Sequence, residues 1–287
     1  IKTNNLTTLI SKKLESDFEY TNNLLHFAHN IILNTTKENK YFLEADNLQK
    51  KEIISKKFTS LINNSKNITI LNYADSNGNI IYSSNSLNGE INISDREHFQ
   101  ILKNNENLTT TFSDVITSKM TGKSSLVLAR AMRDENKDLL GVITAVININ
   151  TINEILASID LGENGVSLLR RSDNTKLISR YPSSETVELN QSLPENNPII
   201  VRIRTGEKTG TLEYIASTDG KKRVGSFLVM EDFPFYVQTA ISEDVYLDSW
   251  KEDLKVVAVL FVLFIFITFL IFFILNKSFK KEQLAVK

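Results

Sequence analysis

The stretch from residue 94 to residue 146 decides the fold, and it opens with Ser94-Asp95-Arg96-Glu97-His98-Phe99. We interpret this opening as the start of a short helix. Three runs of strand character follow: Thr111–Thr117, Ser124–Met132 and Leu140–Ile149. The residues Thr121-Gly122-Lys123 form a turn between the first run and the second. A short helix that places Arg96 and an aromatic pair on a curved antiparallel sheet is a common way to build a small pocket. A pocket for a small ligand is therefore predicted here.

Composition narrows the class of protein. The chain has 287 residues, enough for two modest domains, and its 33 basic and 34 acidic side chains leave a net charge of -1. Such a balance gives no bulk attraction for nucleic acid or for acidic lipid. The sequence has no cysteine, which excludes disulfides and thiol chemistry, and its three histidines (His26, His29 and His98) form no ligand cluster. We therefore expect neither a metal nor a cofactor.

The N-terminal segment has the pattern of one long amphipathic helix. Its apolar residues recur at steps of three, four and seven without an interrupting Pro or Gly: Leu6, Ile10, Leu14, Phe18, Leu25, Ala28 and Ile32. A helix over Thr8–Thr36 would be about 43 Å long at roughly 1.5 Å per residue. It could be an ordinary packing helix, but the length favours a spine, over residues 1–42, that leads from a first membrane segment. Because the chain starts at Ile1 rather than Met, we expect that an upstream segment has been removed.

The middle of the chain repeats one order of elements. A helix is predicted over Asp46–Asn63, and a hairpin follows over residues 68–83, because Asn77-Gly78 supplies the positive φ angles of a tight turn. After a connecting helix at Thr151–Leu161, a hairpin, a loop-helix insert and three strands recur, with the strands at Gly165–Arg170, Lys176–Arg180, Thr209–Ala216, Lys222–Val229 and Phe235–Ser242. The sequence therefore predicts an α+β fold with a duplicated unit, over residues 43–155 and 156–249.

The run Val256–Leu275 carries no charge, and it has the length that crosses a bilayer as a helix. The run is followed by three lysines, Lys277, Lys280 and Lys281. By the positive-inside tendency we expect the C-terminus in the cytoplasm and the residues before 250 outside. The stub Asn276–Lys287 is too short for an output domain, and we expect that such a domain follows it.

Several short motifs occur in an order that resembles a known family. The first unit has Asp95-Arg96-Glu97-His98-Phe99, Thr121-Gly122-Lys123 and Gly141-Val142-Ile143, and the second has Leu168-Leu169-Arg170-Arg171, Arg180-Tyr181-Pro182, Asp219-Gly220 and Phe233-Pro234. In this order they resemble the double Cache sensor domains of bacterial transmembrane receptors such as diguanylate cyclases and histidine kinases. The resemblance implies two PAS-like modules, periplasmic or extracellular, on a receptor of the bacterial inner membrane. It also implies a homodimer formed through the N-terminal helix.

The resemblance further implies a ligand site in the first unit. Arg96 matches an arginine that holds a carboxylate or another anion, Phe99 matches an aromatic residue that packs against the ligand, and His98 stands where Tyr or Trp is frequent. Acidic positions of amino-acid-binding members correspond to Ser118 and Val146, so an ammonium group would lack a counter-charge. A smaller or monoanionic ligand is expected, and the candidate site residues are Arg96, His98, Phe99, Ser118, Lys123 and Ser125.

Simpler roles are open for these residues. Arg96 could cap the helix, His98 could be a packing residue or a pH sensor, and Lys123 could be solvated in its turn. The first hypothesis is the ligand-sensing region of a transmembrane receptor whose output is a cyclase, a kinase or a chemoreceptor. A membrane-anchored module that binds a protein partner is the second, and a sealed apolar cavity behind Arg96 would favour it. The third, an extracytoplasmic hydrolase, lacks a visible nucleophile–base pair.

Overall fold

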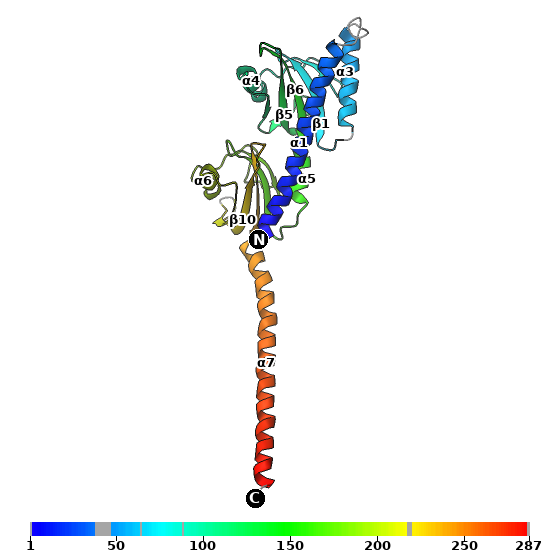
Figure 1. The fold of residues 1–287 in the computed structure, drawn as a ribbon. Helices are drawn as coiled ribbons and strands as arrows, with labels where there is room; N and C mark the ends of the chain where they lie inside the picture. The colour runs from blue at the N-terminus through cyan, green and yellow to red at the C-terminus, as the bar shows by residue number, and fades with distance from the viewer. Residues whose placement is uncertain (1, 38–46, 64, 88, 217–219, 286–287) are drawn as a thin grey trace.

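The computed structural model describes residues 2–37, 47–63, 65–87, 89–216 and 220–285. Its first element, α1 (Lys2–Lys37), is one continuous helix of 36 residues, about 54 Å long at roughly 1.5 Å per residue. Figure 1 shows α1 running along both sheet modules, with its N-terminus beside the module from which the last helix leaves. The predicted long helix is confirmed, and it begins at Lys2 rather than Thr8.

The distal module, which lies farthest from the last helix, is a sheet covered on both faces. Its strands follow the order β2-β1-β6-β5-β3, every pair is antiparallel, and β4 also pairs with β5. Helices α1 and α3 pack on one side and α4 on the other. The elements are α3 (Asn47–Ile62), β1 (Ile68–Asp75), β2 (Ile80–Ser83), α4 (Glu97–Asn104), β3 (Thr110–Phe112), β4 (Ile116–Thr117), β5 (Ser124–Arg133) and β6 (Leu139–Asn148).

The distal elements with predicted bounds end within one residue of those bounds, except at the strand expected over Thr111–Thr117. The helix expected over Asp46–Asn63 is α3, and Asp46 lies outside the described residues. The single strand expected over Thr111–Thr117 is two short strands, β3 and β4, and the residues between them contact the proximal module through Arg171 and Asn190. This break positions the candidate site, as described below.

The proximal module repeats the distal topology. Its order, β8-β7-β11-β10-β9, places the hairpin and the three later strands as in the first sheet. The predicted repeat of elements is therefore confirmed, while the boundaries at 43–155 and 156–249 stay predictions. The elements are α5 (Ile149–Ala157), which connects the modules, β7 (Val166–Arg171), β8 (Leu177–Tyr181), α6 (Pro198–Arg204), β9 (Thr209–Ile215), β10 (Lys222–Val229) and β11 (Phe235–Ser242).

One hydrophobic core runs through both modules along α1. From Ile10 onwards the helix contributes the predicted apolar residues, among them Phe18 and Leu25. Near its N-terminus it instead buries Thr3, Thr7 and Ser11. The Thr7 and Thr239 hydroxyl oxygens lie 2.7 Å apart, so this end of α1 is hydrogen-bonded to β11. Small hydroxyl side chains let the helix approach the proximal sheet without leaving polar groups unpaired.

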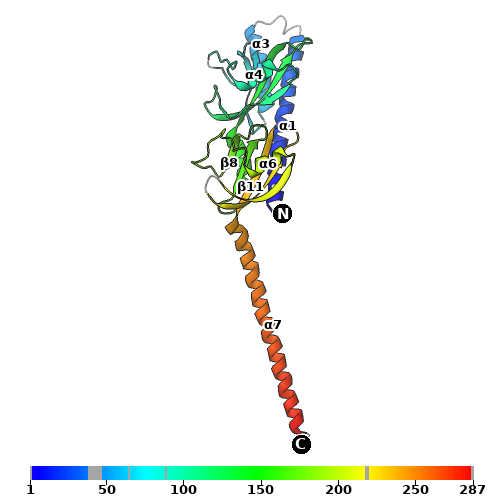
Figure 2. The same cartoon turned by 90° about the vertical axis from the view of Figure 1, so that its left-hand side faces the viewer.

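The last helix, α7 (Glu243–Ala285), follows β11 without a linker and leaves the modules as a single rod (Figure 2). An 18-residue stretch of its segment Asp253–Leu275 has a mean hydropathy of 3.3, and none of that stretch is buried inside the structure. This segment is long and apolar enough to cross a membrane. It contains the predicted span Val256–Leu275.

Candidate functional site

The start of α4 is fixed by a close contact with the β1–β2 hairpin. Gly78, in the hairpin turn, has a φ of +88°, and a Cβ there would lie 2.6 Å from the Ser94 nitrogen. Ile93 N donates a hydrogen bond of 2.8 Å to Gly78 O. Only glycine accommodates both the positive φ and the close approach. The contact holds the chain that leads to Arg96, the N-cap of α4.

Arg96, His98 and Ser118 line one cavity of about 40 Å³ between α4 and the distal sheet, and Asn72 and Thr144 line it from the sheet. The side chains of His98 and Asn72 are 3% and 4% exposed. Within the described part of the chain, His98 Nδ1 and Asn72 Oδ1 have no hydrogen-bond partner. Burial, and then the nearby Arg96 cation, lowers the pKa of His98 to about 4. The imidazole is therefore neutral at pH 7, and two orphaned polar atoms line one cavity.

The turn after β4 closes this cavity. Arg96 Nη2 donates to Thr117 O at 3.0 Å. Lys119 Nζ donates to Asp95 Oδ1 at 2.6 Å and to Asn92 O at 2.8 Å, and the bond to Lys119 lowers the pKa of Asp95. Because the Lys119–Asp95 pair is solvent-accessible, it contributes only about 1 kcal/mol or less. The closing turn is thus held by contacts that break at low cost.

Phe99, Lys123 and Ser125 lie outside this cavity. Phe99 is fully buried in the apolar cluster that includes Leu102 and Ala129. Lys123 is exposed in the turn, and Ser125 Oγ donates to Lys123 O at 3.1 Å. The structure therefore brings together Arg96, His98 and Ser118 among the six predicted residues.

Sequence reasoning missed the sheet side of the cavity. Asn72 and Thr144 are register partners on β1 and β6, and Asn72 Nδ2 lies 3.5 Å from Thr144 Oγ1. An amide in the middle of the strand-like run Ile68–Ala74, directly after Ile70 and Leu71, was the available signal, since a buried polar side chain needs a partner. Lys119 was missed as well, because a lysine in a polar turn is ordinarily solvated.

The segment between β3 and β4 also joins the two modules. Arg171, at the end of β7, is 8% exposed, and its Nη1 donates to Phe112 O and to the next carbonyl oxygen at 3.0 and 3.1 Å. Asp173 binds the same guanidinium through both of its oxygens, at 2.8 and 2.6 Å. Asn190 exchanges two hydrogen bonds with the backbone of Val115, at 2.9 and 2.7 Å. The residues just before the closing turn are thus fixed to the proximal module.

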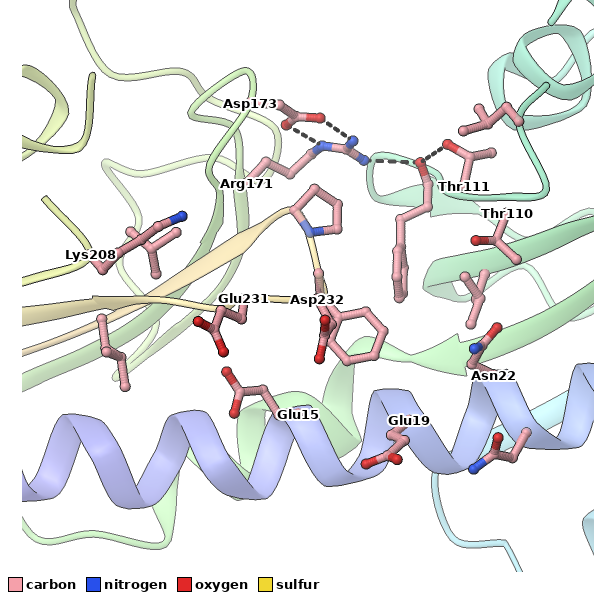
Figure 3. A pocket seen from close by; sticks show the side chains of 18 residues that line it. Glu15, Glu19, Asn22, Thr110, Thr111, Arg171, Asp173, Lys208, Glu231 and Asp232 are labelled. Carbon is pink, nitrogen blue, oxygen red and sulfur yellow. Dashed lines mark hydrogen bonds and ion pairs between the residues drawn. The ribbon is translucent and has the colours of Figure 1, made fainter. Parts of the chain in front are cut away.

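A second cavity, of about 910 Å³, lies between the modules against α1 (Figure 3). Arg171 and Asp173 border it on one side, and on the other Glu15 of α1 points towards Glu231 and Asp232. Burial raises the pKa of Glu15, and the two neighbouring carboxylates raise it further. Among the described residues no group of three His, Asp or Glu side chains could hold a metal ion. Acidic side chains of α1 and of the proximal module therefore face each other across this cavity.

Comparisons with known proteins agree with this geometry. A family model described as Cache domain (dCache_1) matches residues 2–250. An extracellular domain assigned to the histidine kinase rpHK1S-Z16 has a TM-score of 0.70 at 18% identity, covering 87% of this chain and 96% of that one. The periplasmic sensory domain of the Campylobacter jejuni chemoreceptor Tlp1 has a TM-score of 0.64 at 13% identity, covering 84% of this chain and 94% of that one.

A third structure is the ligand-binding domain of the Pseudomonas fluorescens chemoreceptor CtaA in complex with L-isoleucine. Its TM-score is 0.60 at 14% identity, with coverage of 86% of this chain and 93% of that one. A comparison with curated proteins gave no significant match. Identities this low show a shared fold, whereas the family model spans nearly the whole chain. The chain therefore belongs to the Cache domain family.

Proposed function

We propose that this chain is the ligand-sensing region of a membrane-anchored bacterial receptor. The family match supports this proposal, as does the likeness to extracellular sensor domains of a histidine kinase and of chemoreceptors. The exposed apolar segment Asp253–Leu275 supports the anchor. The lysines that follow it favour a cytoplasmic C-terminus, with both modules outside. A cyclase, kinase or chemoreceptor output domain would then receive the signal.

The distal cavity is the proposed ligand site, and its two orphaned polar atoms carry the assignment. Among the described residues, His98 Nδ1 and Asn72 Oδ1 are buried without a hydrogen-bond partner, and both side chains belong to residues that line the same cavity. Leaving such atoms unpaired costs roughly 1–3 kcal/mol each, and a ligand that hydrogen-bonds them removes that cost. Arg96 and Ser118 supply further donors at the edge. A small polar or monoanionic molecule fits this set.

The size and charge of the cavity restrict the ligand. A volume of about 40 Å³ is close to that of one water molecule, so a ligand with several heavy atoms requires the turn after β4 to move outwards. No described lining residue is a carboxylate. An α-ammonium group would therefore be desolvated without a counter-charge, at a cost of several kcal/mol. We expect small hydroxy acids and monocarboxylates to bind better than the matching α-amino acids.

Transmission from this site follows the chain. Movement of Thr117 and Ser118 pulls on residues 113–115, which Arg171 and Asn190 hold to the proximal module. Arg171 ends β7, β7 pairs with β11, and β11 continues directly into α7. A ligand can shift α7 only by the difference in its affinity for the two positions of the turn. Packed interfaces convert such small displacements into rigid-body shifts.

A homodimer through α1 is part of the proposal. Leu9, Tyr20 and Phe27 are exposed by 60%, 43% and 58%. They are separated by about three and about two turns of a helix with roughly 3.6 residues per turn, so they form one stripe. A second copy of the same stripe would bury it. Light scattering of the full chain in detergent should give a dimer, and Phe27→Glu should give a monomer. An unchanged mass would remove this part of the proposal.

Binding of a protein partner in place of a metabolite is the competing function. A sealed, wholly apolar cavity would have favoured it, but Asn72, His98 and Thr144 make this cavity polar. The geometry therefore favours a small ligand.

A thermal-shift screen tests the assignment. The probes are matched pairs such as L-lactate and L-alanine, together with acetate and propionate. A ligand at 100 times its dissociation constant stabilises the folded chain by about 2.7 kcal/mol. We expect hits among the hydroxy acids or monocarboxylates that weaken at least about tenfold in Arg96→Ala, through loss of a charge-assisted hydrogen bond. They should be unchanged in the control Arg204→Ala, on α6 of the other module. A hit with equal affinity for Arg96→Ala would refute the site.

A further inference from the structure

The proximal module contains a cavity of about 480 Å³ on one face of its sheet. Strands β7 and β9 supply most of its sheet side, with Gln238 of β11 between them, and the chain between β8 and α6 covers it. This volume lies within the usual range of about 300–1,000 Å³ for small-molecule pockets. It is also far larger than the distal cavity of about 40 Å³.

The sheet side of this cavity carries a buried cation, Arg170. Its side chain is 5% exposed, and no carboxylate forms an ion pair with it within the described residues. Its Nη1 donates to Thr175 O at 2.8 Å and to Gln191 O at 2.7 Å, while its Nε has no described acceptor. Burial lowers the pKa of Arg170. A buried charge that only carbonyl dipoles balance is costly, and an anion would balance it fully.

The remaining lining favours the same ligand charge. Arg180 and Arg223 also line the cavity, whereas the only carboxylate among its described lining residues is the exposed Glu213. Behind the lining, the register partner of Arg170 on β11 is Tyr236, which packs in an apolar cluster with Ile199 and whose buried hydroxyl has no partner among the described residues. The rest of the wall is largely apolar, from Leu168, Leu193, Ile199 and Leu212. A guanidinium fork matches a carboxylate, and these walls match a hydrocarbon body.

We propose that the proximal cavity is a second ligand site, which binds an organic carboxylate through Arg170. The proposal does not depend on the distal site. It adds an input close to the membrane. Gln191, which accepts from Arg170, follows Asn190, which is hydrogen-bonded to Val115 of the distal module. A carboxylate that draws Arg170 away from Gln191 O therefore changes the contact between the modules.

Calorimetry on the full chain in lipid nanodiscs tests the second site, with butyrate, benzoate and succinate as probes and inorganic phosphate as the comparison. At least one of the three carboxylates should bind with a dissociation constant of about 1 mM or lower. Arg170→Gln and Arg180→Gln should each weaken that binding at least about tenfold, since each removes a charge-assisted donor. The control is Arg204→Gln, an exposed arginine that pairs with Glu195 at 3.2 Å outside the cavity, and it should bind like the wild type.

Three results would overturn the proposal. The first is that none of the three carboxylates binds at about ten times the stated constant. The second is that phosphate alone binds. The third is that the affinity is unchanged in Arg170→Gln, which would place the ligand elsewhere, the distal cavity included. Arg170→Gln can be judged only if it keeps the native circular dichroism spectrum. If it does not, Arg180→Gln decides whether the carboxylate binds in the proximal cavity. Arg180 is half-buried and lies on the edge strand β8, where a substitution is tolerated more readily.

Discussion

Replacing Phe18 with alanine tests whether the two modules share one core. Phe18 of α1 is 2% exposed, and its ring centroid lies 5.2 Å from that of distal Phe112 and 5.2 and 5.5 Å from those of proximal Phe235 and Phe233. Truncating a buried phenylalanine costs about 3–5 kcal/mol. The loss of three ring contacts at a site that cannot easily collapse argues for the upper half of that range. We expect a loss of about 4 kcal/mol.

The matched control is Phe27→Ala, the same substitution on the same helix. Phe27 is 58% exposed, so its truncation should change stability by no more than about 0.5 kcal/mol. Urea denaturation of residues 1–249 measures both variants, at a dilution where light scattering shows a monomer. This fragment retains every residue of the hydrophobic core clusters. At about 2–4 °C per kcal/mol, Phe18→Ala should also lower the melting temperature by roughly 10 °C. Equal stability of the two variants would refute the shared core.

Three further predictions concern charged and titratable groups. The pKa of His98 is about 4 in the folded chain, against an ordinary value of 6.5. Its contribution to the free energy of unfolding is therefore complete above pH 6.5 and is lost as the pH falls towards 4. At about 1.4 kcal/mol per pKa unit, the loss is up to about 3 kcal/mol. His98→Gln should flatten the melting temperature between pH 4 and pH 7, and an unchanged slope would contradict the burial argument. The raised pKa of Glu15 means that its ionisation opposes folding as the pH rises through and above its ordinary value, so Glu15→Gln should raise the melting temperature at pH 7 and leave it unchanged at pH 3. Arg171→Ala removes a donor from the half-exposed Asp173 and from two distal carbonyl oxygens, and it should cost about 1–3 kcal/mol in denaturant titrations, against about 0.5 kcal/mol or less for Arg204→Ala.

Periodicity predicted the helices and strands because burial on one face imposes it. The strands Lys222–Val229 and Phe235–Ser242 were predicted with the bounds that the structure has. The break after Phe112 could not be read from the sequence. It arises because the backbone of residues 113–115 bonds to Arg171 and Asn190, which lie far along the chain.

The hydrophobic pattern also missed residues of the contact between α1 and the proximal sheet. Leu6 was predicted on the buried face and is half-buried, whereas Thr3 and Thr7 face β10 and β11 through hydrogen bonds that no apolar periodicity reveals. At the candidate site the helix start gave Arg96 and His98, because both sit on one recognisable motif. Asn72 and Thr144 come together only through the pairing of β1 with β6, a register that a single strand does not specify.

Amide hydrogen exchange tests most directly whether the distal site is coupled to the membrane helix. The exchange of the full chain in nanodiscs is measured with and without the monocarboxylate or hydroxy acid that binds best in the screen. The transmission route predicts slower exchange in the turn at residues 117–123 and also at residues 188–191 and 235–247. Protection confined to the distal module, with residues 235–247 unchanged, would contradict that coupling.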